Sequence, residues 1–184
     1  PAPSEGEYLM VISGEDWGPA VAKLVVCAGK RIAPGKVGKD MFSVAVHAQD
    51  LDWKTRKASV VDRRRDVVDA YVSDKAGNRT GEPSPYIAVE LPMHPADALA
   101  NPLLWDPADE FNKWKKPFDF SVESPILKVP ATRCVGRACP EADAFKLDKH
   151  SSAGMALSYA WYQPKESGAR PLIVWLHGAG EGGE

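Results

Sequence analysis

The residues of this chain best suited to chemistry lie in its last eight positions, 177–184, which read HGAGEGGE. Four of the eight are glycines, which let the backbone turn sharply and let a ligand approach main-chain N–H groups closely. A histidine and two glutamates add groups that can exchange protons or carry charge. A loop of this composition that follows a strand is a common place for a binding or catalytic site.

The element that must position this loop is the apolar run Leu172–Leu176 directly before it. Its five consecutive apolar residues show no alternation, which predicts a strand buried on both faces of a parallel sheet. Such a strand needs neighbours that we do not find elsewhere in the chain. We therefore expect it to belong to a domain continued outside these residues, and a flexible glycine tail is disfavoured because it would not normally follow such a run.

A dinucleotide-binding turn is a rival interpretation of the same glycines. Gly178, Gly180 and Gly183 satisfy the spacing G-x-G-x-x-G after a strand. Against it, Glu181 would place a negative charge beside a pyrophosphate, no helix follows, and the ribose-binding acid expected about twenty residues later is absent. The pattern therefore does not favour a nucleotide cofactor.

Upstream, the chain reads as short strands separated by turn-forming residues. Several segments are short apolar runs or alternate apolar and polar residues with period two, and Gly, Pro and Asp clusters separate them. This pattern predicts a β-sandwich. The expected strands are Val21–Cys27, Phe42–His47, Val67–Val72, Tyr86–Leu91 and Phe118–Val122.

Composition sets broad limits on function. The chain has 184 residues, 44% of them hydrophobic and 26% charged, as in globular proteins. Its net charge of −2 gives no global field that would favour nucleic acid or an anionic membrane. No apolar run approaches the roughly 20 residues that cross a bilayer. The polar start at Pro1 is of the kind left after a signal peptide or a cloning cut is removed.

Two surface features suggest binding rather than catalysis. Residues 53–57 and 63–65 form a basic stretch with an aromatic residue, but interleaved aspartates cancel much of its field, so we expect a solvated loop. Trp17 and Trp53 are candidates for exposed aromatic platforms that could stack on sugar rings or polyester. A polymer-binding module therefore stays an alternative.

Two cysteines suggest a disulfide. Cys134 and Cys139 lie in RCVGRACP, where two thiols could meet across a short turn in an oxidising compartment. Zinc would need two more well-spaced ligands, so no metal site is expected. Cys27 follows apolar neighbours and is expected to behave as a small buried hydrophobic residue.

The ending resembles the α/β-hydrolase superfamily, in which the strand before the first helix leads into a His-Gly loop of the oxyanion hole. The matching residues are His177, Gly178, Ala179 and Gly180. More narrowly, WLHGAGEGG is similar to secreted esterases of the carboxylesterase and polymer-depolymerase type that carry an N-terminal immunoglobulin-like domain. Further matching pieces, in the same order as in that family, are Phe42–Val44, Asp69–Asp74, Gly77–Asn78, Tyr86, Asn101–Leu103 and Trp114–Phe118.

The resemblance implies roles for the loop. The backbone N–H of Ala179 would point at the oxyanion, Gly180 would shape the turn, and His177 with Gly178 would be structural. The family's triad runs Ser, acid, His along the chain, so the base should lie downstream, and Glu181 is expected to be solvated. No G-x-S-x-G elbow occurs, and Ser151, Ser152 and Ser158 precede the oxyanion strand, on the wrong side for the nucleophile.

The sequence therefore predicts an immunoglobulin-like β-sandwich (1–130), a linker that holds the expected disulfide (131–144) and the first strands of an α/β-hydrolase domain (145–184), opened by a hairpin that includes Met155–Tyr162. The predicted function is the N-terminal part of a secreted or periplasmic serine esterase acting on small or polymeric esters, without a cofactor. Its partner would be the remainder of the hydrolase domain, which holds nucleophile, acid and base. Peptidase action stays open, and the alternative is a non-catalytic polymer- or protein-binding module.

Overall fold

The computed structural model describes residues 1–176 except 53, 107, 109 and 167. The described residues form β-strands and one short 3-10 helix, η1, and contain no α-helix. The elements are β1 (Glu7–Glu15), β2 (Gly18–Ile32), η1 (Lys39–Met41), β3 (Ser43–Asp52), β4 (Lys57–Arg65), β5 (Asp69–Ser73), β6 (Ser84–Glu90), β7 (Leu103–Asp106), β8 (Phe111–Trp114), β9 (Phe118–Glu123), β10 (Arg133–Ala138), β11 (Lys146–Ser152) and β12 (Met155–Trp161).

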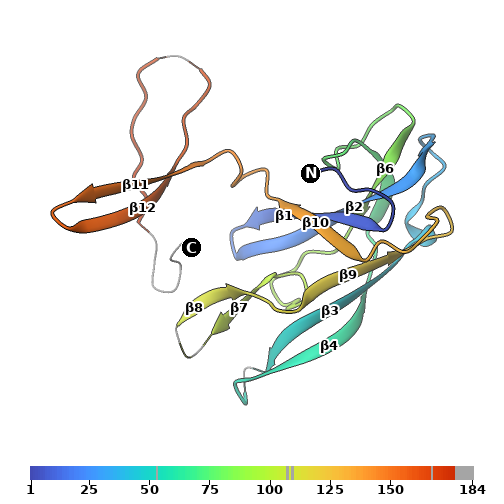
Figure 1. Cartoon of the computed structure of the whole chain (residues 1–184), viewed down its shortest axis with the longest axis horizontal. Helices are drawn as coiled ribbons and strands as arrows, with labels where there is room; N and C mark the ends of the chain where they lie inside the picture. Colours follow the sequence, from blue (N-terminus) through green and yellow to red (C-terminus); the bar gives the residue numbers. More distant parts are fainter. Residues whose placement is uncertain (53, 107, 109, 167, 177–184) are drawn as a thin grey trace.

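Two sheets lie one against the other and form the sandwich predicted for the N-terminal part (Figure 1). The larger sheet has the order β10-β1-β2-β6-β5, and the smaller has the order β4-β3-β9. All pairs in the two sheets are antiparallel except β10 with β1, which is parallel. Strands β7 and β8 pair only with each other, as do β11 and β12.

The core lies between the two sheets because the strands that face each other alternate apolar residues inward. Val44 and Val46 on β3 are 1% exposed, and Ala45 between them points to the open face. The opposing sheet contributes inward side chains from its central strands in the same way. The inward residues include Tyr8, Met10, Val21, Leu24, Val26, Ile87, Val89, Phe118, Phe120 and Val122.

One hydrogen bond crosses this apolar layer. The hydroxyl of Tyr8 on β1 accepts the backbone N–H of Phe120 on β9 at 2.9 Å, and the two rings meet edge to face at 6.1 Å. Tyr8 is 0% exposed, and burial raises the pKa of its phenol well above the ordinary value of 10.0. The neutral phenol therefore joins the two sheets at a point where water does not reach.

The five expected strands are all present in the sandwich, as β2, β3, β5, β6 and β9 with shifted ends. The prediction of a solvated loop for the basic stretch is wrong for residues 57–65. They form β4, which pairs along its length with β3. Charged residues can occupy β4 because it is an edge strand, where side chains on the open face stay in water.

The predicted linker 131–144 also contains a strand. Residues of β10 pair with β1 from Glu7↔Arg133 to Val11↔Ala138, so this segment extends the larger sheet. Arg133 forms an ion pair with the buried Glu7 across this pair of strands. The segment that connects the last sandwich strand to the next strand therefore consists of residues 139–145, which is shorter than the predicted linker.

After this segment, β11 and β12 form a hairpin that stands apart from the sandwich as an arm (Figure 1). A hairpin was expected here, but β12 pairs with the preceding β11 and not with the chain that follows it. The two-residue turn places Ala153 at φ 50° and Gly154 at φ 80°, the left-handed geometry of a tight hairpin turn. The described residues thus hold no α-helical part of a hydrolase domain, and no helix among them could span a membrane.

Tyr8→Phe should destabilise the sandwich by about 1–3 kcal/mol, because it leaves the buried N–H of Phe120 without an acceptor. The midpoint of urea unfolding measures the change. Tyr162→Phe, at a side chain that is 53% exposed, is the matched control and should leave the midpoint in place. Equal midpoints for Tyr8→Phe and the unmodified chain would contradict the bridging role.

The same tyrosine makes stability depend on alkaline pH. Burial raises the pKa of Tyr8, so as pH increases the unfolded chain loses this proton before the folded chain does. Above the ordinary value of 10.0 the folded state therefore binds more protons than the unfolded state, and stability falls as pH rises. The free energy of unfolding should therefore decline more steeply in the unmodified chain than in Tyr8→Phe between about pH 9 and pH 11. Parallel declines would show that Tyr8 is not the titrating group.

Candidate functional site

The predicted oxyanion loop lies outside the described residues. This applies to His177, Gly178, Ala179 and Gly180, and to the neighbouring Glu181. Their roles therefore stay predictions drawn from the sequence. What the structure does describe is the segment that leads to them.

That segment, Leu172–Leu176, was predicted as a buried strand but has no strand partner among the described residues. Its side chains are exposed to between 72% and 87%, including Trp175 at 86%. A strand forms only where neighbouring backbone groups can complete its hydrogen bonds, and the arm β11–β12 does not provide them. Five adjacent apolar side chains in water mark a surface that another element must cover.

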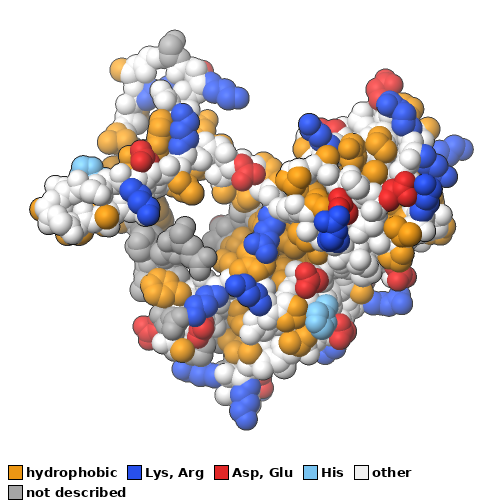
Figure 2. All heavy atoms as spheres, viewed as in Figure 1, with side chains coloured by type: hydrophobic (Ala, Val, Ile, Leu, Met, Phe, Trp, Pro, Cys, Tyr) orange, Lys and Arg blue, Asp and Glu red, His pale blue; other side chains and the backbone are white. Residues whose placement is uncertain are grey.

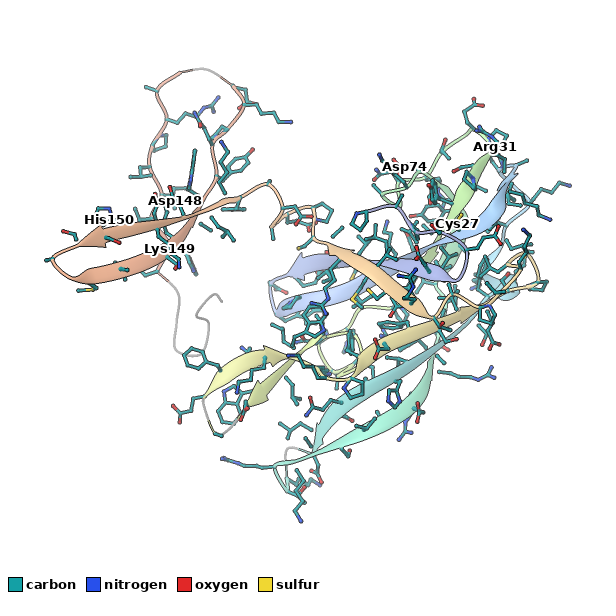
Figure 3. All side chains as sticks on the ribbon, viewed as in Figure 1. Cys27, Arg31, Asp74, Asp148, Lys149 and His150 are labelled. Atoms are coloured by element: carbon teal, nitrogen blue, oxygen red, sulfur yellow. The ribbon has the colours of Figure 1, made fainter. Side chains whose placement is uncertain are left out.

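The arm carries residues that resemble a catalytic triad in kind but not in geometry. Asp148, His150 and Ser152 alternate along one face of β11. Among the described residues, no hydrogen bond joins the His150 ring to Asp148 or to Ser152, as a catalytic triad would require. The carboxylate of Asp148 instead accepts the hydroxyl of Tyr159 at 3.2 Å. Figure 3 shows Asp148 and His150 on the arm, away from the side chains of the sandwich.

The predicted disulfide between Cys134 and Cys139 does not fit the structure. Both are free thiols, as is Cys27, which is half-buried. Cys134 lies near the start of β10 and Cys139 directly after its end, so the extended strand separates them by roughly 16 Å. A disulfide needs Cα atoms within about 7 Å. The short turn expected between them is absent because β10 pairs with β1.

The outer face of the larger sheet carries a groove of about 610 Å³. Side chains of β1, β2 and β6 form its floor, and Pro140 and Glu141 of the segment after β10 line one part of it. Val68 and Met93, exposed to 53% and 41%, lie at its rim. The groove is open to solvent and is lined by both polar and apolar side chains. It therefore suits an extended ligand that carries both kinds of group better than a reaction that requires the exclusion of water.

A polar network on the same face fixes Lys23. Its Nζ donates to the hydroxyl of Tyr71 at 3.1 Å and lies 3.5 Å from Glu90 Oε1, to which Tyr71 donates at 2.6 Å. Burial alone would lower the pKa of Lys23, but the bond to Tyr71 and the charge of Glu90 leave it above its ordinary value. Burial also raises the pKa of Tyr71. Neither group is therefore a base at neutral pH, and the network is structural.

Two cations are buried beside the sandwich core, and both were missed in the sequence. Arg65 donates to the carbonyls of Leu99 at 2.6 Å and Pro92 at 2.7 Å, and pairs with Asp97 at 3.1 Å. Lys115 donates to the carbonyl of Ala98. Burial lowers the pKa of both side chains. Because their donors are used by backbone carbonyls, they hold the 92–101 segment in place rather than a ligand.

Within the described part of the chain, no group of three or more His, Cys, Asp or Glu side chains is arranged to hold a metal ion. The described residues thus provide a scaffold, a groove and an exposed arm.

Comparison with known proteins agrees with an N-terminal sandwich followed by a separate segment. The family model of the esterase Ig-like N-terminal domain matches residues 7–126. Among solved structures, that of a thermostable esterase matches with a TM-score of 0.66 at 17% identity, over 88% of this chain and 43% of the esterase chain. Identity at this level shows a shared fold, and the chain spans less than half of that esterase. No curated protein matches the chain.

Arg65→Met should cost about 2–3 kcal/mol of unfolding free energy, because two part-buried carbonyls and Asp97 lose a charged donor. Amide hydrogen exchange in residues 92–101 should become faster. Arg64→Met, on the exposed face of the same strand, is the control and should change stability by less than about 0.5 kcal/mol. Equal effects of the two substitutions would rule out the proposed anchoring of this segment.

Proposed function

This chain belongs to the family of esterase Ig-like N-terminal domains, and on that premise we propose that it is the N-terminal part of a secreted or periplasmic serine esterase. The reaction is hydrolysis of a carboxylic ester by acyl transfer to water. The sandwich ends with β10, and a hydrolase domain begins near Phe145. The nucleophile, acid and base belong to a part of the protein outside these 184 residues.

One observation supports this proposal above the others. The family match ends at residue 126, and further along, at Leu172–Leu176, the chain presents an apolar run, exposed to 72–87%, that leads into a His-Gly motif. In an α/β-hydrolase such a run is the buried strand that precedes the oxyanion loop. Its exposure here is explained if the rest of the hydrolase sheet covers it.

The mechanism assigns a limited task to this chain. A serine from the hydrolase domain attacks the ester carbonyl, and the backbone N–H of Ala179, with a second N–H, stabilises the negative oxygen of the tetrahedral intermediate. A histidine of that domain takes the serine proton and returns it to the leaving alcohol. Water then attacks the acyl-enzyme and releases the acid. This chemistry needs no cofactor.

A second function, binding of a polymer or protein without catalysis, is favoured by the open groove of about 610 Å³ on the sandwich. The two functions differ in one observable property. A binding module would retain substrate without turnover, and no serine of the intact protein would react with a fluorophosphonate.

Ala179→Pro in the full-length protein should reduce kcat by about 10²–10³-fold with little change in KM, because proline has no N–H to donate to the oxyanion. Ala179→Ser keeps the N–H and should retain most of the activity. Thermal unfolding of both variants checks that the domain is intact. Fluorophosphonate labelling of a serine outside residues 1–184 identifies the nucleophile, whereas an active Ala179→Pro enzyme would remove Ala179 from the oxyanion hole.

A further inference from the structure

Residues 1–6, which precede β1, fold back over the larger sheet, and we call them the strap (Figure 1). A tight turn leads from the strap into β1. The backbone N–H of Glu7 donates to the carbonyl of Ser4 at 3.1 Å, and the carboxylate of Glu7 accepts the N–H of Ser4 at 2.8 Å. Pro3 is buried although it lies outside the strands. The strap is therefore a packed part of the sandwich.

The strap is bonded to the segment that leads into β10. The carbonyl of Gly6 accepts the backbone N–H of Thr132 at 3.0 Å and that of Arg133 at 3.2 Å. Glu5 also pairs with Lys128 at 3.2 Å, but this ion pair is exposed and contributes little to stability. The two backbone hydrogen bonds thus join the end of the strap to the start of β10.

Two glycines leave the space that the strap fills. A Cβ atom at Gly136, within β10, would lie 2.9 Å from Cγ of Pro1, and a Cβ atom at Gly29 of β2 would overlap the carboxylate of Glu5. Leu9 of β1 lies 3.7 Å from the same Cβ position of Gly136 and is only 4% exposed. Because β1 lies between β2 and β10, the strap crosses all three strands on the outer face of the sheet.

The pairing of β10 is weak by itself. It is the edge strand of the larger sheet and pairs with β1 alone, in the parallel arrangement, which is slightly less stable per residue than the antiparallel one. None of its six residues is fully buried. A strand with one neighbour and few buried side chains opens at a low free energy. Contacts from the strap therefore matter more for β10 than for the central strands.

The position of β10 matters because the chain leaves the sandwich from it. Residues 139–145 alone separate β10 from the arm. Figure 2 shows an open space between the arm and the sandwich. The direction in which the arm leaves therefore depends on how firmly β10 and this short connection are held.

We propose that the strap clamps β10 onto the larger sheet and so fixes the point at which the chain leaves the sandwich. When the strap is released, β10 separates from β1 more often, whereas the strands around the core stay folded. Neither the strap nor β10 belongs to the proposed hydrolase domain, so this proposal is independent of the esterase function.

The first test changes the strap and measures β10 in the full-length protein. Pro3→Gly removes a buried ring and frees the backbone of the strap without altering β10. Amide hydrogen exchange in residues 133–138 should become about tenfold faster, because β10 then opens at a lower free energy. Ala2→Gly, at the exposed neighbouring residue, is the matched control and should leave this exchange unchanged.

The effect of Pro3→Gly must also be local. Exchange in β3 and β9, on either side of the smaller sheet's core layer, should keep the rates of the unmodified protein. Unchanged exchange in residues 133–138 would overturn the proposal. An equal increase throughout both sheets would overturn it too, since the strap would then support the whole sandwich and not β10 in particular.

The second test changes β10 at its contact with the strap. The methyl group of Gly136→Ala displaces Pro1, so the half-buried thiol of Cys134 should react about tenfold faster with a maleimide, as peptide mapping would show. Gly14→Ala is the matched control, because it makes the same change in β1 where a Cβ atom has nothing within 4 Å. Equal reaction rates of Cys134 in the two variants would contradict the clamping of β10.

Discussion

The sandwich depends on the exclusion of water from the layer between its two sheets. Within that layer, the buried hydroxyl of Tyr8 reaches across to the other sheet, where it accepts the N–H of Phe120. Such a bond is strong in an apolar setting and costly to break there. It also fixes the relative position of β1 and β9, and β1 in turn pairs with both β2 and β10. The last sandwich strand is thus placed through the first.

The arm β11–β12 lacks a layer of this kind. Along β12, the side chains of Met155, Leu157 and Tyr159 share one face and are exposed to between 44% and 63%. The run Leu172–Leu176 is exposed still more. Two apolar surfaces in one short stretch of chain are what a sheet presents before its neighbours and covering helices are in place. The contrast between the sandwich and the arm is the physical basis of our proposal that they belong to different domains.

The sequence predicted the strands whose apolar and polar residues alternate around the core. The prediction failed for strands that carry many charges or that pair with a strand distant in the sequence. Val44 and Val46 show period two, so β3 was evident. In β4, arginines hide the same period. Its open face is solvated, and the inward Arg65 donates to carbonyls of residues 92–101 and pairs with Asp97, contacts that no local pattern reveals. The spacing of Cys134 and Cys139 suggested a turn, because nothing local indicates that β10 pairs with β1. The oxyanion loop rests on its motif alone.

The central claim is that residues 172–176 form a buried strand of a hydrolase domain in the full-length protein. Amide hydrogen exchange of this segment in that protein tests it most directly. Our account predicts protection comparable to that of β2 and β3 in the sandwich core, because both neighbours of the strand would be hydrogen-bonded to it. Exchange at the rate of an unstructured chain would contradict it.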